Sequence, residues 1–187
     1  PPTEEKEPTP SELLELQGWV GEIGWLAIRG RPDLAYYFSL LGQVMRKHVH
    51  YAQQLVKKVW KYLAGTTWFY FRLSADGDML HLLTFSDAGF GGIGERGQSG
   101  CLILWGGCLV LWRSIRQPTP STSTTEAEVG ACSLANQLCE GLRELIHDVL
   151  FEPLREGMLL DNEANLRVAH LGGTWRSRYF ATVSYTH

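Results

Sequence analysis

The chain has 187 residues, a net charge of −3 at pH 7 and 44% hydrophobic residues. This composition excludes a disordered protein and predicts one or two domains with a hydrophobic core. Apolar runs are too short to cross a membrane, so we expect an intracellular protein with no membrane partner. Four cysteines without a CxxC pair argue against a zinc site and predict buried free thiols.

The charge is unevenly distributed along the chain. Residues 1–30 carry a net charge of −4, residues 31–73 carry +6 and residues 74–187 carry −5. A basic middle segment is typical of a surface that faces phosphates. The alternative is a helix face whose lysines and arginines are simply solvated.

Helical patterns dominate the first third of the chain. PPTEEKEPTP, residues 1–10, predicts a flexible lead, and Ser11 can cap a helix that runs to about Ile28. Asp33 is the expected cap of a second helix in GRPDLAYYFSLLGQVMRK. The apolar stripe of HYAQQLVKKVWKYLAGTT predicts a third helix, which Gly65 ends.

Strand patterns follow the helices. TWFYFRL at 67–73 and MLHLLTFSD have strand composition, and GCLILWGGCLVLW predicts a hairpin that turns at Gly106–Gly107. A long amphipathic helix is expected from about Thr125 to Leu150, followed by a short strand, GMLLD, and a helix, NEANLRVAHL. Antiparallel neighbours, followed by a strand after a long helix, predict an α/β fold with a mixed sheet.

Carboxylates stand at the ends of two predicted strands and at the start of the long helix. Asp87 and Asp161 each end an apolar strand, and Glu126 and Glu128 lie in the first turns of the helix. Clustered carboxylates repel each other unless a cation lies between them, and hard divalent ions such as Mg²⁺ take that place. The alternative is that both aspartates begin turns and that both glutamates favour the helix N-terminus.

Five segments, which follow one another along the chain as they do in the family, resemble copia-type (Pseudoviridae-like) retrotransposon polyproteins. SDAGFGG, RGQSGCLILWGGCLVLWRSIRQPTPSTSTTEAEVGA and LLDNEAN resemble the ribonuclease H domain, and RGRPDLAYYFSLLGQVM and KKVWKYLAGTT resemble the segment that joins it to reverse transcriptase. The resemblance implies a ribonuclease H-like mixed sheet of three antiparallel strands and then a parallel strand, with flanking helices. It implies three parts: a lead at 1–10, a helical connection or thumb-like segment of reverse transcriptase at 11–73, and a C-terminally incomplete nuclease domain at 74–187.

The same resemblance implies the activity and its residues. The expected function is metal-dependent hydrolysis of the RNA strand of RNA–DNA hybrids, with Mg²⁺ or Mn²⁺, two ions in all, held by Asp87, Glu128 and Asp161. Glu128 is preferred to Glu126 because the family places its glutamate in an Ala-Glu-hydrophobic string, here Ala127-Glu128-Val129. Glu126 is then a supporting or capping group, and Ser86 and Asn162 are expected to support the metal ligands.

Partners and location follow from the family as well. The expected partners are an RNA–DNA hybrid and the remainder of the reverse transcriptase polyprotein, in the cytoplasm, a virus-like particle or the nucleus. A nuclease of this kind holds the duplex mainly through its phosphates. The expected nucleic-acid contacts are Arg113, Arg116, Lys57, Lys58 and Lys61.

The sequence also departs from the family pattern. The family has a fourth metal-site aspartate after a final strand, and no such segment precedes His187. Tyr179 and Ala181 stand where the family has histidine and aspartate. The alternative function is therefore a catalytically weak or inactive nucleic-acid-binding remnant of the domain.

Overall fold

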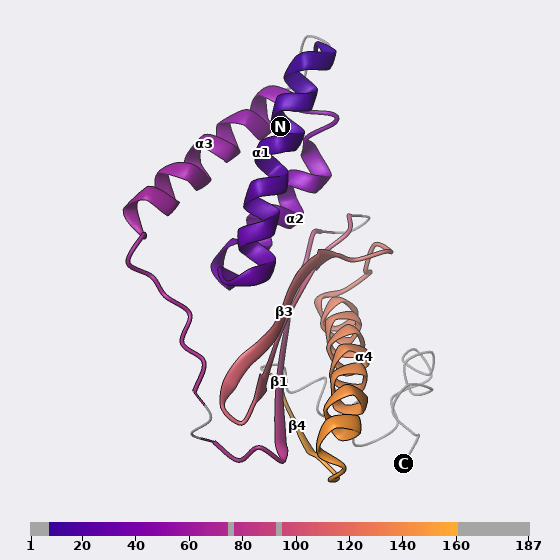
Figure 1. Cartoon of the computed structure of the whole chain (residues 1–187). Helices are drawn as coiled ribbons and strands as arrows, with labels where there is room; N and C mark the ends of the chain where they lie inside the picture. The colour runs from indigo at the N-terminus through magenta and orange to yellow at the C-terminus, as the bar shows by residue number, and fades with distance from the viewer. Residues whose placement is uncertain (1–7, 75–76, 93–94, 161–187) are drawn as a thin grey trace. The chain divides into compact units, whose positions relative to one another are not determined.

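The computed structural model describes residues 8–74, 77–92 and 95–160, and these form two units (Figure 1). The first unit spans residues 1–72 and the second residues 73–187. Each unit has its own cluster of buried apolar side chains. The fourth strand is the last described element, so the helix expected at 162–171 and the tail lie outside the described residues.

The first unit is helical, as predicted. It contains α1 (Pro10–Arg29), the short 3-10 helix η1 (Pro32–Leu34), α2 (Ala35–Val44) and α3 (Val49–Gly65). The expected cap of α1 was wrong by two residues, because Thr9 accepts a hydrogen bond from the backbone N–H of Glu12 and forms a capping box with it. The expected cap at Asp33 was also wrong, since this residue lies within η1.

The core of the first unit lies between its three long helices. Gly24 lets α1 approach α2, because a Cβ atom there would lie 2.4 Å from the ring of Phe38. Apolar side chains recur at helical spacing on all three helices, which turn these faces toward one another. The fully or nearly fully buried members are Leu16, Val20, Ile23, Ala27, Leu34, Leu41, Val49, Ala52, Leu55, Val56 and Val59.

The second unit is a mixed sheet with a long helix. Its elements are β1 (His81–Gly89), β2 (Gln98–Trp105), β3 (Cys108–Arg116), α4 (Thr124–Leu150) and β4 (Arg155–Leu160). The strand order is β3-β2-β1-β4, in which β1, β2 and β3 pair antiparallel and β4 pairs parallel to β1. The predicted α/β fold class, with three antiparallel strands followed by a parallel strand, is confirmed.

The predicted hairpin turn is also confirmed. Gly106 and Gly107 both adopt positive φ, 55° and 84°, between β2 and β3. Positive φ at both central residues is what a type I′ two-residue hairpin turn requires, and glycine adopts it without strain.

The helix α4 covers one face of the sheet (Figure 1). Leu82 of β1 and Ile103 of β2 are fully buried with Cys139 and Ile146 of α4. Along β1, burial alternates, so that Leu82, Thr84 and Ser86 are buried while Asp87 is exposed. Successive strand residues point to opposite faces. Asp87 is thus exposed near the end of β1, directly after the last buried residue of this strand.

The strand predicted at 67–73 was wrong. Residues 69–74 form neither helix nor strand, and their aromatic side chains are largely exposed. Aromatic residues favour strands only where a neighbouring strand pairs with them. All four cysteines are free, as expected, and no helix in the described part of the chain has the length and apolar character to span a bilayer.

Candidate functional site

Asp87 lies near the end of β1, opposite Gly100 of β2. Its side chain is exposed, and Oδ1 accepts a hydrogen bond of 2.9 Å from the backbone N–H of Ala88. Its neighbour across the strand pair has no side chain, so the carboxylate stands beside bare backbone. An exposed carboxylate at such a place is open to a cation or to solvent.

The pairing of β1 with β4 is described up to the residues that directly precede the two sequence-predicted aspartates. The last described pair of this parallel ladder is Ser86 with Leu160. Asp87 is the next residue after Ser86, and Asp161 is the next residue after Leu160. Asp161 and Asn162 themselves lie outside the described residues.

Side-chain hydrogen bonds of Ser123 and Glu126 hold the N-terminus of α4. Ser123 accepts a hydrogen bond from the backbone N–H of Glu126, and the Glu126 carboxylate accepts bonds of 2.5 and 2.7 Å from the backbone N–H and hydroxyl of Thr122. These two bonds lower the pKa of Glu126. The Glu126 carboxylate is thus engaged by the residue before the N-cap of α4.

Gln117 connects the sheet to the start of α4, and its role has no signal in the sequence. It is 5% exposed and follows β3 directly. Its Nε2 donates to Ser99 Oγ at 3.0 Å and to the carbonyl oxygen of Ala127 at 2.7 Å, while Oε1 accepts from Ser121 Oγ at 3.0 Å. Ser99 pairs with Ala88, the residue after Asp87.

Two glycines leave room for the Gln117 side chain. A Cβ atom at Gly97 would lie 2.9 Å from Gln117 Oε1, and one at Gly130 would lie 3.4 Å from its Nε2. The buried alanines of α4 (Ala127, Ala131 and Ala135) allow the helix to lie close to the sheet. Together these residues set the position of the helix start relative to the end of β1.

The other candidate ligands and supports are placed as follows. Glu128 is half-buried, one residue beyond Ala127 on α4. Ser86 is buried, and its hydroxyl has no hydrogen-bond partner in residues 8–74, 77–92 and 95–160. Within these same ranges no group of three or more His, Cys, Asp or Glu side chains is arranged to hold a metal ion. The sequence-predicted set of three includes Asp161, which is outside them.

The basic residues predicted to contact nucleic acid are all exposed. Arg113 and Arg116 lie on β3, and Lys57, Lys58 and Lys61 lie on α3 of the other unit. Within each unit these side chains are open to a polyanion. Burial raises the pKa values of the Cys101, Cys132 and Cys139 thiols, so we assign these cysteines to packing and not to chemistry.

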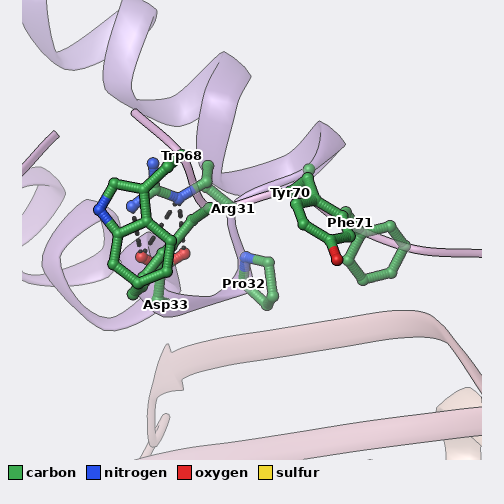
Figure 2. A pocket seen from close by; sticks show the side chains of 8 residues that line it. Arg31, Pro32, Asp33, Trp68, Tyr70 and Phe71 are labelled. Atoms are coloured by element: carbon green, nitrogen blue, oxygen red, sulfur yellow. Dashed lines mark hydrogen bonds and ion pairs between the residues drawn. The ribbon is translucent and has the colours of Figure 1, made fainter. Parts of the chain in front are cut away.

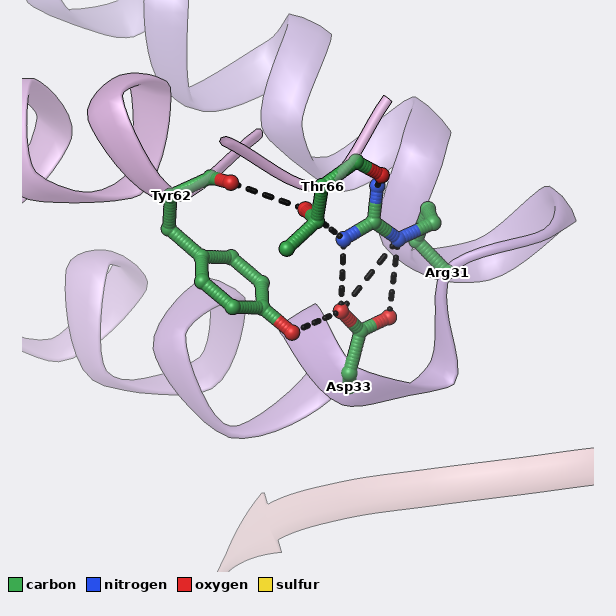
Figure 3. A network of polar contacts seen from close by, with 4 residues as sticks. All are labelled: Arg31, Asp33, Tyr62 and Thr66. Atoms are coloured by element: carbon green, nitrogen blue, oxygen red, sulfur yellow. Dashed lines mark hydrogen bonds and ion pairs between the residues drawn. The ribbon is translucent and has the colours of Figure 1, made fainter. Parts of the chain in front are cut away.

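A second polar cluster lies within the first unit (Figure 3). Arg31 binds the Asp33 carboxylate through Nε and Nη2, the latter at 2.7 Å, and Nη2 also donates to Thr66 Oγ1 at 2.8 Å. The Tyr62 hydroxyl donates to Asp33 at 2.8 Å. Burial acts to raise the pKa of Asp33, but the hydrogen bonds from Arg31 and Tyr62 outweigh it and lower the pKa.

This cluster borders a pocket of about 340 Å³ (Figure 2). Its lining consists of residues 30–33 on one side and the aromatic run Trp68, Phe69, Tyr70 and Phe71 on the other. The Arg31 guanidinium lies 5.5 Å from the ring centres of both Tyr62 and Phe69, within cation–π range. Aromatic side chains thus line the pocket on one side, and the ion pair of Arg31 with Asp33 lies on the other. We call it the aromatic recess.

Comparison with known proteins identifies the relatives of this chain. No protein-family profile matches it. The Transposon Ty1-LR3 Gag-Pol polyprotein of Saccharomyces cerevisiae is 26% identical over 178 residues, and the Ty1-H Gag-Pol polyprotein is 25% identical over the same length. These yeast transposon polyproteins are homologues of this chain. Each alignment covers 91% of this chain and 10% of the polyprotein, so the chain spans about a tenth of the length of the curated relatives it matches.

Solved structures similar to this chain include two of a ribonuclease H1. LC11-RNase H1, isolated from compost by a metagenomic approach, aligns with a TM-score of 0.43 at 16% identity, over 57% of this chain and 71% of that one. The same enzyme in complex with an RNA/DNA hybrid aligns with a TM-score of 0.42 at 18% identity, over 55% and 73%. The resemblance to copia-type retrotransposon polyproteins, expected from the motifs, is confirmed by the Ty1 relatives.

Proposed function

We propose that this chain belongs to a retrotransposon reverse transcriptase polyprotein and supplies a ribonuclease H-type activity that cuts the RNA strand of RNA–DNA hybrids. The observation that carries the proposal is the parallel register of β1 and β4, whose last described pair, Ser86 with Leu160, directly precedes Asp87 and Asp161 in the sequence. The similarity to Ty1 Gag-Pol polyproteins supports the polyprotein context. In this proposal residues 11–73 form the connection segment and residues 74–187 the nuclease.

The donor set suits hard divalent cations. Asp87, Glu128 and Asp161 supply only carboxylate oxygens, which Mg²⁺ and Mn²⁺ prefer. Two such ions, when bound, activate water and stabilise the leaving 3′-oxygen of a phosphodiester. The exposed carboxylate of Asp87 fits this role, because its one described hydrogen bond comes from Ala88 and leaves most of its oxygen lone pairs accessible.

The contacts of Glu126 argue against it as the helix ligand, which leaves Glu128 in this proposal. The Glu126 carboxylate is engaged twice by Thr122 and holds the first turn of α4. Taking it for a metal would leave the backbone N–H of Thr122 without this partner. Gln117 Nε2 donates to the carbonyl of Ala127, directly before Glu128, and to Ser99 Oγ of β2, and so fixes this part of the helix against the sheet.

The remaining residues bind the substrate or support the metal ligands in this proposal. Arg113 and Arg116 are exposed cations on β3 and are assigned to the phosphates of the hybrid. Ser86 and Asn162 are assigned to the support of the two aspartates. The hydroxyl of Ser86 is suited to this because it is buried and has no partner in the described part of the chain.

Cleavage of a short hybrid labelled on its RNA strand tests the proposal. With Mg²⁺ or Mn²⁺ we expect cleavage by the full chain and a loss of about a hundredfold or more in the Asp87→Asn and Glu128→Gln variants. Glu140→Gln, an exposed carboxylate further along α4, is the matched control and should cleave normally. Glu126→Gln should also retain cleavage, which separates the two helix glutamates.

Two results would overturn the proposal. Cleavage that persists in Asp87→Asn would remove this residue from the site. Hybrid binding without any cleavage by the unchanged chain would favour the alternative, a nucleic-acid-binding remnant without activity.

A further inference from the structure

The first unit exposes an aromatic segment that the proposed nuclease does not use. Trp68 is 71% exposed and Tyr70 is 85% exposed, on a stretch of backbone that forms neither helix nor strand. Large exposed aromatic side chains that follow one another closely along the chain are candidates for a binding surface. The pocket described above lies against the same segment.

The support of this segment holds the rings in place without covering them. The backbone N–H of Phe69 donates to the carbonyl oxygen of Thr66 at 3.1 Å. The ring of Phe69 lies over Arg31 and meets Trp68 edge to face, with ring centres 4.4 Å apart and planes at 89°. Trp68 is thus positioned by a partner that is itself fixed, which reduces the conformational entropy that a ligand must overcome.

The part of the chain that contains the segment is strongly basic. Residues 31–73 contain seven bases and one acid, Asp33, which is bound to Arg31. Lys58 lies one helical turn before Tyr62 on the same face of α3, and Tyr62 reaches Asp33 at the edge of the pocket. Lys61 directly precedes Tyr62, and both lysines are exposed. The exposed lysines of α3 share their helix with no carboxylate, because α3 contains neither Asp nor Glu.

We propose that this surface binds unpaired single-stranded nucleic acid, with bases stacked on Trp68 and Tyr70 and phosphates on Lys58 and Lys61. Base stacking on aromatic rings, together with a basic track for the backbone, is the general way in which proteins hold single strands. Only unpaired bases offer free faces to such rings, since the bases of a duplex stack on each other. The positive charge favours a polyanion over an apolar peptide as the occupant. The inference does not rest on the proposed hydrolysis.

Binding of short deoxyribonucleotides by the full chain tests this assignment. The probes are fluorescently labelled single strands about 12 nucleotides long, one of thymidines and one abasic strand with the same phosphates. We expect the thymidine strand to bind about tenfold or more tightly than the abasic strand. The Trp68→Ala/Tyr70→Ala double variant should bind both strands equally weakly, and Trp68→Phe/Tyr70→Phe should restore the preference.

Two matched variants separate stacking from charge. Trp25→Ala removes another exposed tryptophan, 65% exposed on α1, and should leave binding unchanged. Lys58→Ala/Lys61→Ala should weaken both strands alike and reduce the slope of log affinity against log salt by about 0.7 for each lysine that faces a phosphate. Circular dichroism confirms that each variant keeps its helices.

Several outcomes would overturn the proposal. Equal affinity of the unchanged chain for both strands would show that the rings bind no bases. Unaltered affinity for the thymidine strand in the Trp68→Ala/Tyr70→Ala variant would show the same. So would a loss of that affinity in Trp25→Ala equal to the loss in the double variant. Absence of any binding to either strand would assign the surface to a protein partner. An Asp87→Asn chain that cannot cleave hybrids should still bind the thymidine strand, which keeps this test distinct from that of the nuclease.

Discussion

Replacing Gln117 with leucine should destabilise the second unit more than any other single polar substitution we consider. The change keeps the side-chain volume nearly constant but removes three hydrogen bonds, to Ser99, Ala127 and Ser121. At about 1 kcal/mol for each bond, and because the partners stay buried, we expect a loss of about 3 kcal/mol in the free energy of unfolding. For a unit of this size that corresponds to a fall of about 12 °C in Tm.

Hydrogen exchange followed by mass spectrometry measures this effect locally. Amides in peptides from β2, β3 and the first turns of α4 should exchange about a hundredfold faster or more in Gln117→Leu than in the unchanged chain. Peptides from α1 and α3 belong to the other unit and serve as the internal reference. Gln98→Leu is the matched control, because Gln98 is only half-buried and donates to Ser114 Oγ at 2.9 Å.

The reasoning would be refuted by a specific result. A loss below about 1 kcal/mol in Gln117→Leu, or one no larger than that of Gln98→Leu, would mean that the buried amide does not hold α4 to the sheet.

Three further perturbations have defined outcomes. Because the pKa of Asp33 is lowered in the folded state, its pairing with Arg31 stabilises the first unit above the ordinary carboxyl pKa, and that stability is lost as the pH falls through the lowered value. Circular dichroism of the helices at decreasing pH should show this loss, and Asp33→Asn should show a flatter profile with lower stability at neutral pH. Gly106→Ala should cost about 1–2 kcal/mol in urea unfolding, because alanine is strained at φ 55°. Ser123→Ala should cost about 1 kcal/mol in the same assay, because the N–H of Glu126 loses its cap.

Local signals in the sequence predicted most of the fold. The glycine pair at 106–107 located the hairpin, and the apolar stripe of α4 located the helix to within a residue of its start. The parallel placement of β4 followed from the long helix before it. These features depend on periodicity and turn chemistry, which neighbouring residues determine.

The features that the sequence did not predict depend on contacts between distant residues. Gln117 is a polar residue in a polar segment, and its burial is decided by Ser99 and Ala127, which are 18 and 10 residues away. Asp33 looked like a helix cap, but the guanidinium fork of Arg31 binds it instead. The run at 67–73 has strand composition without the paired strand that would make it one.

The candidate site shows the same division. The aspartate that ends β1 was visible in the sequence because a charge interrupts an apolar strand. The choice between the two helix glutamates has a structural argument only in the hydrogen bonds that Thr122 donates to Glu126, which the sequence does not reveal. The aromatic recess on the first unit was missed because its rings were assigned to a strand.

Among the residues that the structure describes, the two hydrophobic clusters share no member, and the boundary between the units falls between Arg72 and Leu73. Substitutions in the core of one half therefore need no compensating change in the core of the other. Each core can therefore change in sequence under its own packing constraints. Chimeras joined near residue 72 should accordingly fold whenever each parental half does.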